Sequence, residues 1–60
     1  MGERVIVEKV ERGQDCYVLY VRTVEGERKA LKVVASVPPR EGQSFMVVKE
    51  IGLINVLQPI

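Results

Sequence analysis

Apolar residues recur at every second position of the sequence, most clearly in the two segments between Cys16 and Val37. A period of two places successive side chains on opposite faces of a strand, whereas an amphipathic helix needs spacings of three and four. Valine is the commonest residue, and its branching at Cβ favours strands over helices. The chain is therefore predicted to be all β.

Turn residues divide the chain into five predicted strands. Glycine-containing polar clusters separate most of them, and Pro38-Pro39 ends the third, because proline cannot donate to a ladder. The expected strands cover residues 4–11, 16–24, 27–37, 44–50 and 53–57. Strands with such short connections predict an antiparallel five-stranded meander that curls into a barrel or half-barrel, in the size class of SH3-like and OB-like domains.

The short length of the chain limits how it can be stabilised. Its 60 residues, 1–60, allow one small β domain with a single core. The only cysteine, Cys16, has no partner within the chain for a disulfide, and without histidine there are too few ligands for structural zinc. We expect the stability to come from an apolar core and from association with another chain or a large ligand.

The central hairpin has two possible registers, which differ in loop length. If Gly26 is the left-handed residue of a three-residue loop, one face of the hairpin is wholly apolar. A two-residue loop would mix polar and apolar residues on both faces. We prefer the first register, which predicts a core face of Tyr17, Leu19, Val21, Leu31, Val33, Ala35 and Val37. The opposite face then carries Cys16, Val18, Tyr20, Arg22, Arg28, Ala30, Lys32 and Val34.

Residue types that carry catalysis are scarce. There is no histidine to act as a base, and Ser36, Ser44 and Cys16 have no evident activating partner. The five glycines are spread singly among turns, so no phosphate-binding loop is formed. We therefore expect a protein that is not an enzyme and that holds no cofactor or metal.

The basic residues of the hairpin are the candidate binding site. Arg22 faces a basic residue in either register, Arg28 with the longer loop or Lys29 with the shorter one, and like charges directly opposite destabilise a sheet. Two sources of compensation remain open: the glutamates at the hairpin tip, Glu25 and Glu27, or a bound anion such as phosphate.

With a bound phosphate, Tyr20 and Lys32 on the same face would add a stacking ring and a further cation. Arg40 would be an outlying phosphate contact. The predicted nucleic-acid-binding residues are Tyr20, Arg22, Arg28, Lys29, Lys32 and Arg40.

Several strands also supply apolar side chains to both faces, and a single sheet can bury only one. The residues expected to remain outside a barrel are Ile6, Val18, Val34, Met46, Val48 and Ile54. Their burial in a homo-oligomer or against a protein partner is favoured, because a chain this small needs additional buried surface.

Two functions follow from these features. The first is a non-catalytic module that binds RNA or DNA with weak sequence specificity, alone or within a ribonucleoprotein. The second is a structural or protein-interaction subunit that associates through its apolar sheet face, as a homodimer or in a larger complex. The net charge of +1 gives no whole-domain attraction to nucleic acid, so binding would need a local patch.

No apolar run is long enough for a membrane span and no signal-peptide pattern is present, so we expect a cytoplasmic protein without a membrane partner.

Overall fold

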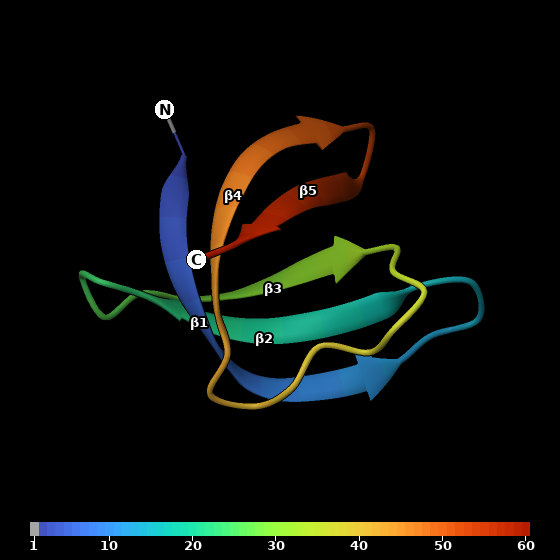
Figure 1. Ribbon diagram of the computed structural model, residues 1–60, viewed down its shortest axis with the longest axis horizontal. Coiled ribbons are helices and arrows are strands. Elements are labelled where there is room, and N and C mark those ends of the chain that lie inside the picture. Colours follow the sequence, from blue (N-terminus) through green and yellow to red (C-terminus); the bar gives the residue numbers. More distant parts are fainter. Residues whose placement is uncertain (1) are drawn as a thin grey trace.

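The computed structural model describes residues 2–60 and contains five β-strands in that range. They are β1 (Glu3–Arg12), β2 (Tyr17–Thr23), β3 (Arg28–Val33), β4 (Ser44–Ile51) and β5 (Ile54–Pro59), shown in Figure 1. All neighbouring strands are antiparallel, and together they form one sheet. The prediction of an all-β chain with five antiparallel strands is confirmed. Among the described residues there is no helix that could cross a membrane.

The strand order departs from the predicted meander at one connection. The sheet runs β3-β2-β1-β4-β5, so β4 pairs with β1 instead of with β3. Three strands joined by hairpins, followed by a fourth that returns beside the first, form a Greek key. The crossover consists of residues 34–43 and passes in front of β2 and β1 in Figure 1. The continuous meander was wrong because β4 pairs with the edge of β1 that β2 leaves free.

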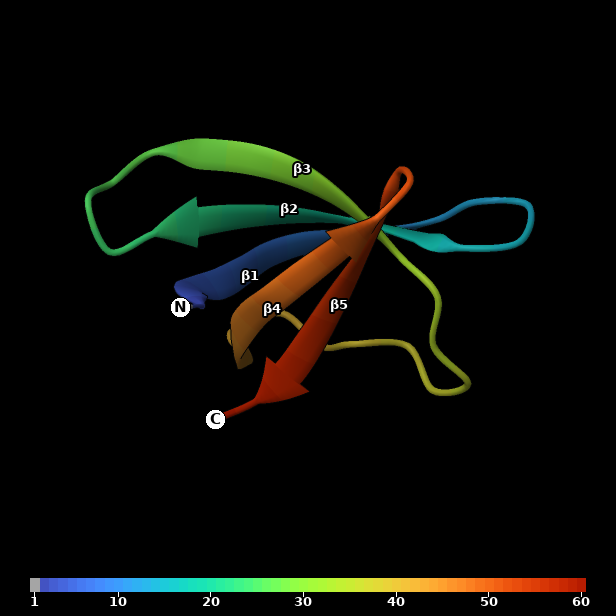
Figure 2. The ribbon, with the colours of Figure 1, turned by 90° about the horizontal axis from the view of Figure 1, so that it is seen from above.

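The sheet is curled but open between its two edge strands. Figures 1 and 2 show the β4–β5 hairpin turned over the side of β1, β2 and β3 that carries the core. Where β3 ends and β5 begins, Nδ2 of Asn55 donates a hydrogen bond to the carbonyl oxygen of Lys32 at 3.4 Å. No ladder joins β3 to β5 within residues 2–60, so the sheet is not closed and the predicted barrel or half-barrel is not confirmed.

Two β-bulges bend the long strands that meet at the centre of the sheet. One interrupts β1 between Val7 and Lys9, and the other interrupts β4 between Val47 and Lys49. An extra residue in one strand bends it and increases its local twist. The first bulge also shifts the alternation along β1, so that Val10 follows Val7 as the next inward residue.

The core lies between the β1–β2–β3 sheet and β4–β5. Its buried apolar side chains are Val5, Val7, Leu19, Val21, Val33 and Phe45. Partly buried residues that pack against them are Val10, Tyr17, Leu31, Val47 and Leu57. Burial of each large apolar side chain contributes about 1.5–3 kcal/mol relative to exposure.

The predicted core face of the hairpin is confirmed as far as Val33 and fails beyond it. Leu19, Val21 and Val33 are buried, but Val37 is 73% exposed and Ala35 is also exposed. β3 ends at Val33 because its partner there is Tyr17, the first residue of β2. With no strand left to pair with, the chain turns into the crossover five residues before Pro38.

The hairpin register with the three-residue loop is confirmed. Tyr17 pairs with Val33, Leu19 with Leu31 and Arg22 with Arg28. Gly26 has a φ of 88° and donates its N–H to the carbonyl oxygen of Thr23 at 3.0 Å. The buried Thr23 also accepts a hydrogen bond at Oγ1 from the N–H of Glu27, at 3.2 Å. These bonds fix the loop, in which Val24 is exposed.

We predict that Gly26→Ala lowers the free energy of unfolding by about 1–2 kcal/mol, because a side chain strains a backbone with positive φ. No atom lies within 4 Å of a Cβ added at Gly26, so steric contact does not contribute. The measurement is urea denaturation followed by circular dichroism. D-alanine at the same position, introduced by chemical synthesis, is the control and should retain the wild-type stability. Equal stability of the L-alanine variant and the wild type would contradict the role given to Gly26.

Candidate nucleic-acid interface

Most of the predicted site residues lie on one surface of β2 and β3. Arg22 pairs with Arg28 and Val18 with Lys32, and these positions alternate with the buried Leu19 and Val21. They therefore point away from the core, as does Tyr20. Side chains from β1 lie beside them. We call this surface the outer face and define it as Glu8, Lys9, Glu11, Val18, Tyr20, Arg22, Arg28, Ala30 and Lys32.

The structure separates Lys29 from this group. Lys29 pairs with the buried Val21, so it points to the opposite side of the sheet. Its Nζ donates a hydrogen bond to Oε1 of Glu3 at 2.9 Å and lies 3.6 Å from Oε1 of Glu27. The hydrogen bond to Glu3 raises the pKa of Lys29. Lys29 thus links β3 to the start of β1 on the side of the core.

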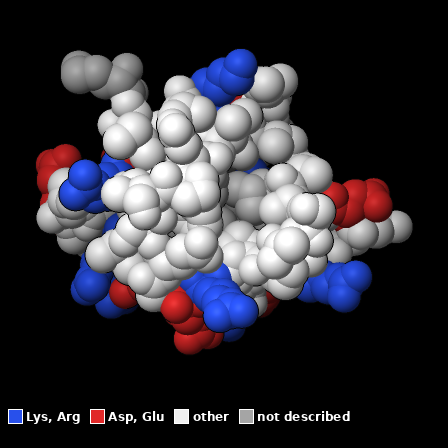
Figure 3. Space-filling view, in the orientation of Figure 1, with Lys and Arg blue, Asp and Glu red and all other residues white. Residues whose placement is uncertain are grey.

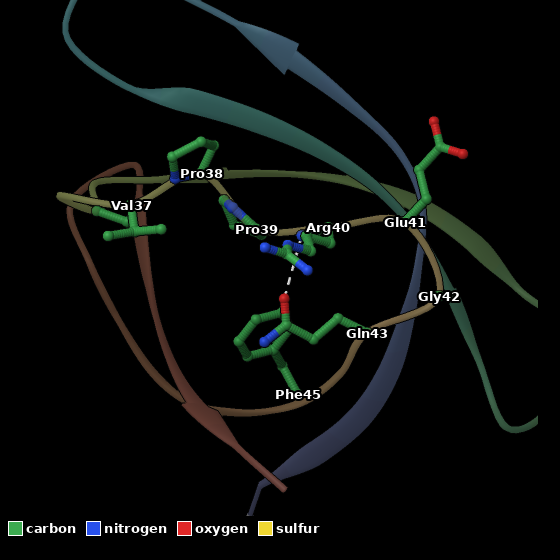
Figure 4. A pocket seen from close by; sticks show the side chains of 9 residues that line it. Val37, Pro38, Pro39, Arg40, Glu41, Gly42, Gln43 and Phe45 are labelled. Atoms are coloured by element: carbon green, nitrogen blue, oxygen red, sulfur yellow. Dashed lines mark hydrogen bonds between the residues drawn. The ribbon is translucent and has the colours of Figure 1, made fainter.

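Arg40 also lies away from the outer face, on the crossover. Its N–H donates to Oε1 of Gln43 at 3.1 Å, and the N–H of Gln43 donates to the carbonyl oxygen of Arg40 at 3.2 Å. Both residues line a cavity of about 620 Å³ together with Pro39 and Phe45 (Figure 4). Arg40 is exposed there, on the crossover and not on β2 or β3, which carry the other predicted cations.

The opposed arginines are compensated by a residue that sequence analysis missed. Oε2 of Glu8 lies 3.9 Å from Nε of Arg22, and Oε1 of Glu8 lies 3.5 Å from Nε of Arg28. Glu8 is the extra residue of the β1 bulge, which directs its carboxylate between the two guanidinium groups. The only signal in the sequence was the slip in alternation from Val7 to Val10.

The compensation expected from the hairpin tip is not found. Glu27 pairs with Lys29 instead, and in the described part of the chain Glu25 forms no ion pair with either arginine. The reason is the register, since the tip residues lie beyond the Arg22–Arg28 pair while Glu8 on the neighbouring strand lies beside it.

Tyr20 is the exposed aromatic residue of the outer face, with 38% of its surface accessible. Its hydroxyl donates a hydrogen bond to Oε1 of Glu11 at 3.0 Å, and Nζ of Lys9 lies 5.8 Å from the ring centroid. The hydrogen bond to Glu11, and next the negative charge of that carboxylate, raise the pKa of Tyr20. The ring is thus tethered at its hydroxyl end while part of its surface remains open to solvent.

At one end of the outer face, Lys32 borders a groove of about 560 Å³. Its apolar walls are Val18, Val34 and Ile54, and the β1–β2 turn closes one side. Figure 1 shows the β1–β2 turn, the end of β3 and the β4–β5 turn together on the right of the molecule. Within residues 2–60 Lys32 forms no ion pair. The groove therefore combines apolar walls with one cation, Lys32, and one carboxylate, Asp15 of the β1–β2 turn.

The outer face carries more positive than negative charge. Its basic residues are Lys9, Arg22, Arg28 and Lys32, and its acidic residues are Glu8 and Glu11. All the ion pairs on this face involve exposed or half-exposed side chains, so each contributes little to stability and is screened by salt. Such a face can attract an anion without a large rearrangement. Among the described residues, no cluster of histidine, cysteine or carboxylate side chains is placed to hold a metal ion.

Three of the predicted outward apolar residues form one group, and the other three are spread over β1 and β4. Val18, Val34 and Ile54 meet in the groove beside Lys32. Ile6 and Met46 lie on the neighbouring strands β1 and β4, and Val48 lies in the β4 bulge with 41% of its surface exposed. Figure 3 shows the side with β4, β5 and the crossover, where charged side chains lie around the margin of a largely uncharged centre.

We predict that Tyr20 ionises at a higher pH than an ordinary tyrosine, whose pKa is 10.0, and that Glu11→Ala lowers this pKa. The pKa of Tyr20 is measured from the ultraviolet absorbance of tyrosinate in a Tyr17→Phe background, in which Tyr20 is the one remaining tyrosine. Because the folded-state pKa is raised, the stabilisation by this hydrogen bond is present below the unfolded-state pKa and disappears as the pH rises through the folded-state value. The control is Glu3→Ala, which removes a carboxylate that contacts Lys29. This variant should leave the titration of Tyr20 unchanged. An unshifted Tyr20 in the parent protein would contradict the hydrogen bond.

Comparison with known proteins assigns the chain to no family. No family model matches it, and neither a curated protein nor a solved structure does. The arrangement of residues on the outer face is therefore the basis for assigning a function.

Proposed function

We propose that the protein is a non-catalytic module that binds nucleic acid through its outer face, with weak sequence specificity. The observation that carries the proposal is the Arg22–Arg28 pair, two like charges held directly opposite on an exposed sheet surface. Opposed like charges destabilise a sheet, and the long contacts of Glu8 offset only part of that cost, which favours an anionic ligand as the reason for the placement. A phosphate group would be stabilised by both guanidinium groups at once.

The neighbouring side chains of the outer face supply the other contacts that a nucleic acid needs. Tyr20 offers a partly exposed ring on which a base can stack, and Lys32 offers a cation for a second phosphate. Successive outward residues on a strand are about 7 Å apart, so Lys32, Tyr20 and the arginines can contact different nucleotides. Phosphate and stacking contacts do not distinguish bases, which is why we expect weak sequence preference.

The architecture supports the same proposal. We infer that the curled Greek-key sheet is a partly open barrel of the OB-like class. In that class the face of the second and third strands, with the loops after the first and fourth strands, holds oligonucleotides. Here the face of β2 and β3 carries the basic residues, and the groove beside Lys32 lies between the β1–β2 turn and the first residue of β5. Because a shared fold does not establish function, the charges on the outer face carry more weight.

A second candidate function is self-association through the β4–β5 hairpin. β5 is an edge strand without any charged residue, whereas the other edge strand, β3, carries Arg28, Lys29 and Lys32. Charged edges prevent pairing with another strand, and uncharged apolar edges permit it. The exposed apolar residues around the hairpin are Val48, Ile51, Leu53 and Ile60. Two copies could pair their β5 edges antiparallel about a two-fold axis.

We predict that replacing both Arg22 and Lys32 by alanine weakens binding of a labelled single-stranded RNA or DNA roughly tenfold. The slope of log affinity against log salt should fall by about 1.4, since each lost phosphate contact on a single strand removes about 0.7. Fluorescence anisotropy at several salt concentrations measures both quantities. The control is Arg40→Ala with Lys49→Ala, which removes the same charge away from the outer face. Equal loss of affinity in both double variants would place the binding elsewhere, and no binding by the parent protein at low salt would refute the proposal.

We predict that Leu53→Lys raises the dissociation constant of a homodimer at least tenfold, if the β4–β5 hairpin is its interface. Leu53 is 77% exposed, so the substitution should leave the fold intact. Sedimentation velocity over a range of protein concentrations measures the association. Val24→Lys is the matched control, because Val24 is 78% exposed at the β2–β3 turn. A parent protein that stays monomeric at high concentration would exclude this second function.

A further inference from the structure

Glu8 occupies the place on the outer face where the proposed phosphate would bind. Its two carboxylate oxygens face different partners, Oε1 toward Nε of Arg28 and Oε2 toward Nε of Arg22. A carboxylate in this position offers the arginines the same kind of anionic oxygen that a phosphate would offer. We propose that Glu8 is a built-in competitor for phosphate at this site. The inference rests on the proposed function and concerns how strongly that site binds.

The contacts of Glu8 are loose enough for exchange. Their distances of 3.9 Å and 3.5 Å exceed the usual length of a hydrogen bond between a charged nitrogen and an oxygen. The side chains of Arg22 and Arg28 are 48% and 78% exposed, so water screens both pairs. An anion that forms direct hydrogen bonds to the guanidinium groups can therefore displace Glu8 at low cost.

The position of Glu8 in the bulge makes this exchange possible without disturbing the sheet. Glu8 is the unpaired residue between Val7 and Lys9, which pair with Val21 and Tyr20. Its side chain is 34% exposed, so it can turn to solvent when an anion arrives. The arginines stay in place because β2 and β3 hold them in register.

Competition by Glu8 has opposite consequences for stability and for affinity. Without ligand, Glu8 neutralises part of the repulsion between Arg22 and Arg28 and so stabilises the sheet. During binding, the same carboxylate must leave and then repels the incoming phosphate. Removing its charge should therefore destabilise the free protein and strengthen the complex. A merely structural Glu8 would change the stability without increasing the affinity.

The test compares Glu8→Gln with the parent protein. We expect Glu8→Gln to bind labelled single-stranded RNA or DNA about threefold to tenfold more tightly by fluorescence anisotropy at low salt. The melting temperature of the free variant should fall by about 2–5 °C. Titration with inorganic pyrophosphate, followed by NMR of the arginine Nε–H groups, should shift the signals of Arg22 and Arg28 at lower concentrations in the variant.

The matched control is Glu25→Gln. Glu25 lies in the loop between β2 and β3, as close in sequence to Arg22 as to Arg28, and in the described part of the chain it forms no ion pair with either. It reports the effect of losing one negative charge near the site. We expect its affinity to change by less than about twofold.

The outcomes separate the two proposals. Tighter binding by Glu8→Gln than by Glu25→Gln, together with the lower melting temperature, supports competition. If both variants gain the same affinity, the effect comes from net charge and not from the position of Glu8. That result would overturn the competitor role and leave the proposed function standing. If neither the parent nor Glu8→Gln binds any nucleic acid or pyrophosphate, the proposed function and the competitor role both fail.

Discussion

The double pairing of β1 organises this small protein. β1 bonds to β2 along one edge and to β4 along the other, so it carries the central inward residues Val5 and Val7. Its bulge bends the strand, and the bend helps to turn β4–β5 over the core. The same bulge supplies Glu8 to the outer face. One irregularity in one strand therefore affects the curl of the sheet, the packing beneath it and the charge above it.

The outer face balances two requirements that oppose one another. A cationic surface attracts phosphate, yet Arg22 and Arg28 placed directly opposite destabilise the sheet of a domain that has a small core. Glu8 lowers this cost because it lies between the arginines, at distances that permit exchange. On the other side of the sheet, Lys29 is held by Glu3 at 2.9 Å, a shorter distance than either contact of Glu8, which suits a structural contact. Charge pairs on the two sides of one hairpin thus differ in how firmly they are held.

Much of the hairpin was predictable because its determinants are local. Gly26 sets the loop, the loop sets the register, and the register places Tyr20, Arg22, Arg28 and Lys32 on one face. Lys29 was included as the partner of Arg22 in the shorter-loop register and Arg40 as an outlying cation, and the structure puts both on other surfaces. The end of β3 was predicted too late, because strand length depends on the partner available in β2 and not only on Pro38. Glu8 was missed because its role depends on a neighbouring strand.

The sequence by itself determined the strand content, the turns and the faces of the central hairpin, since side-chain alternation and glycine conformation act over a few residues. Only the tertiary structure decided that β4 pairs with β1, that the seam between β3 and β5 stays open, and that Glu8 lies between the arginines. These features depend on contacts between residues far apart in the chain. Such contacts form because together they bury the apolar surface that every strand contributes, and no local pattern specifies them.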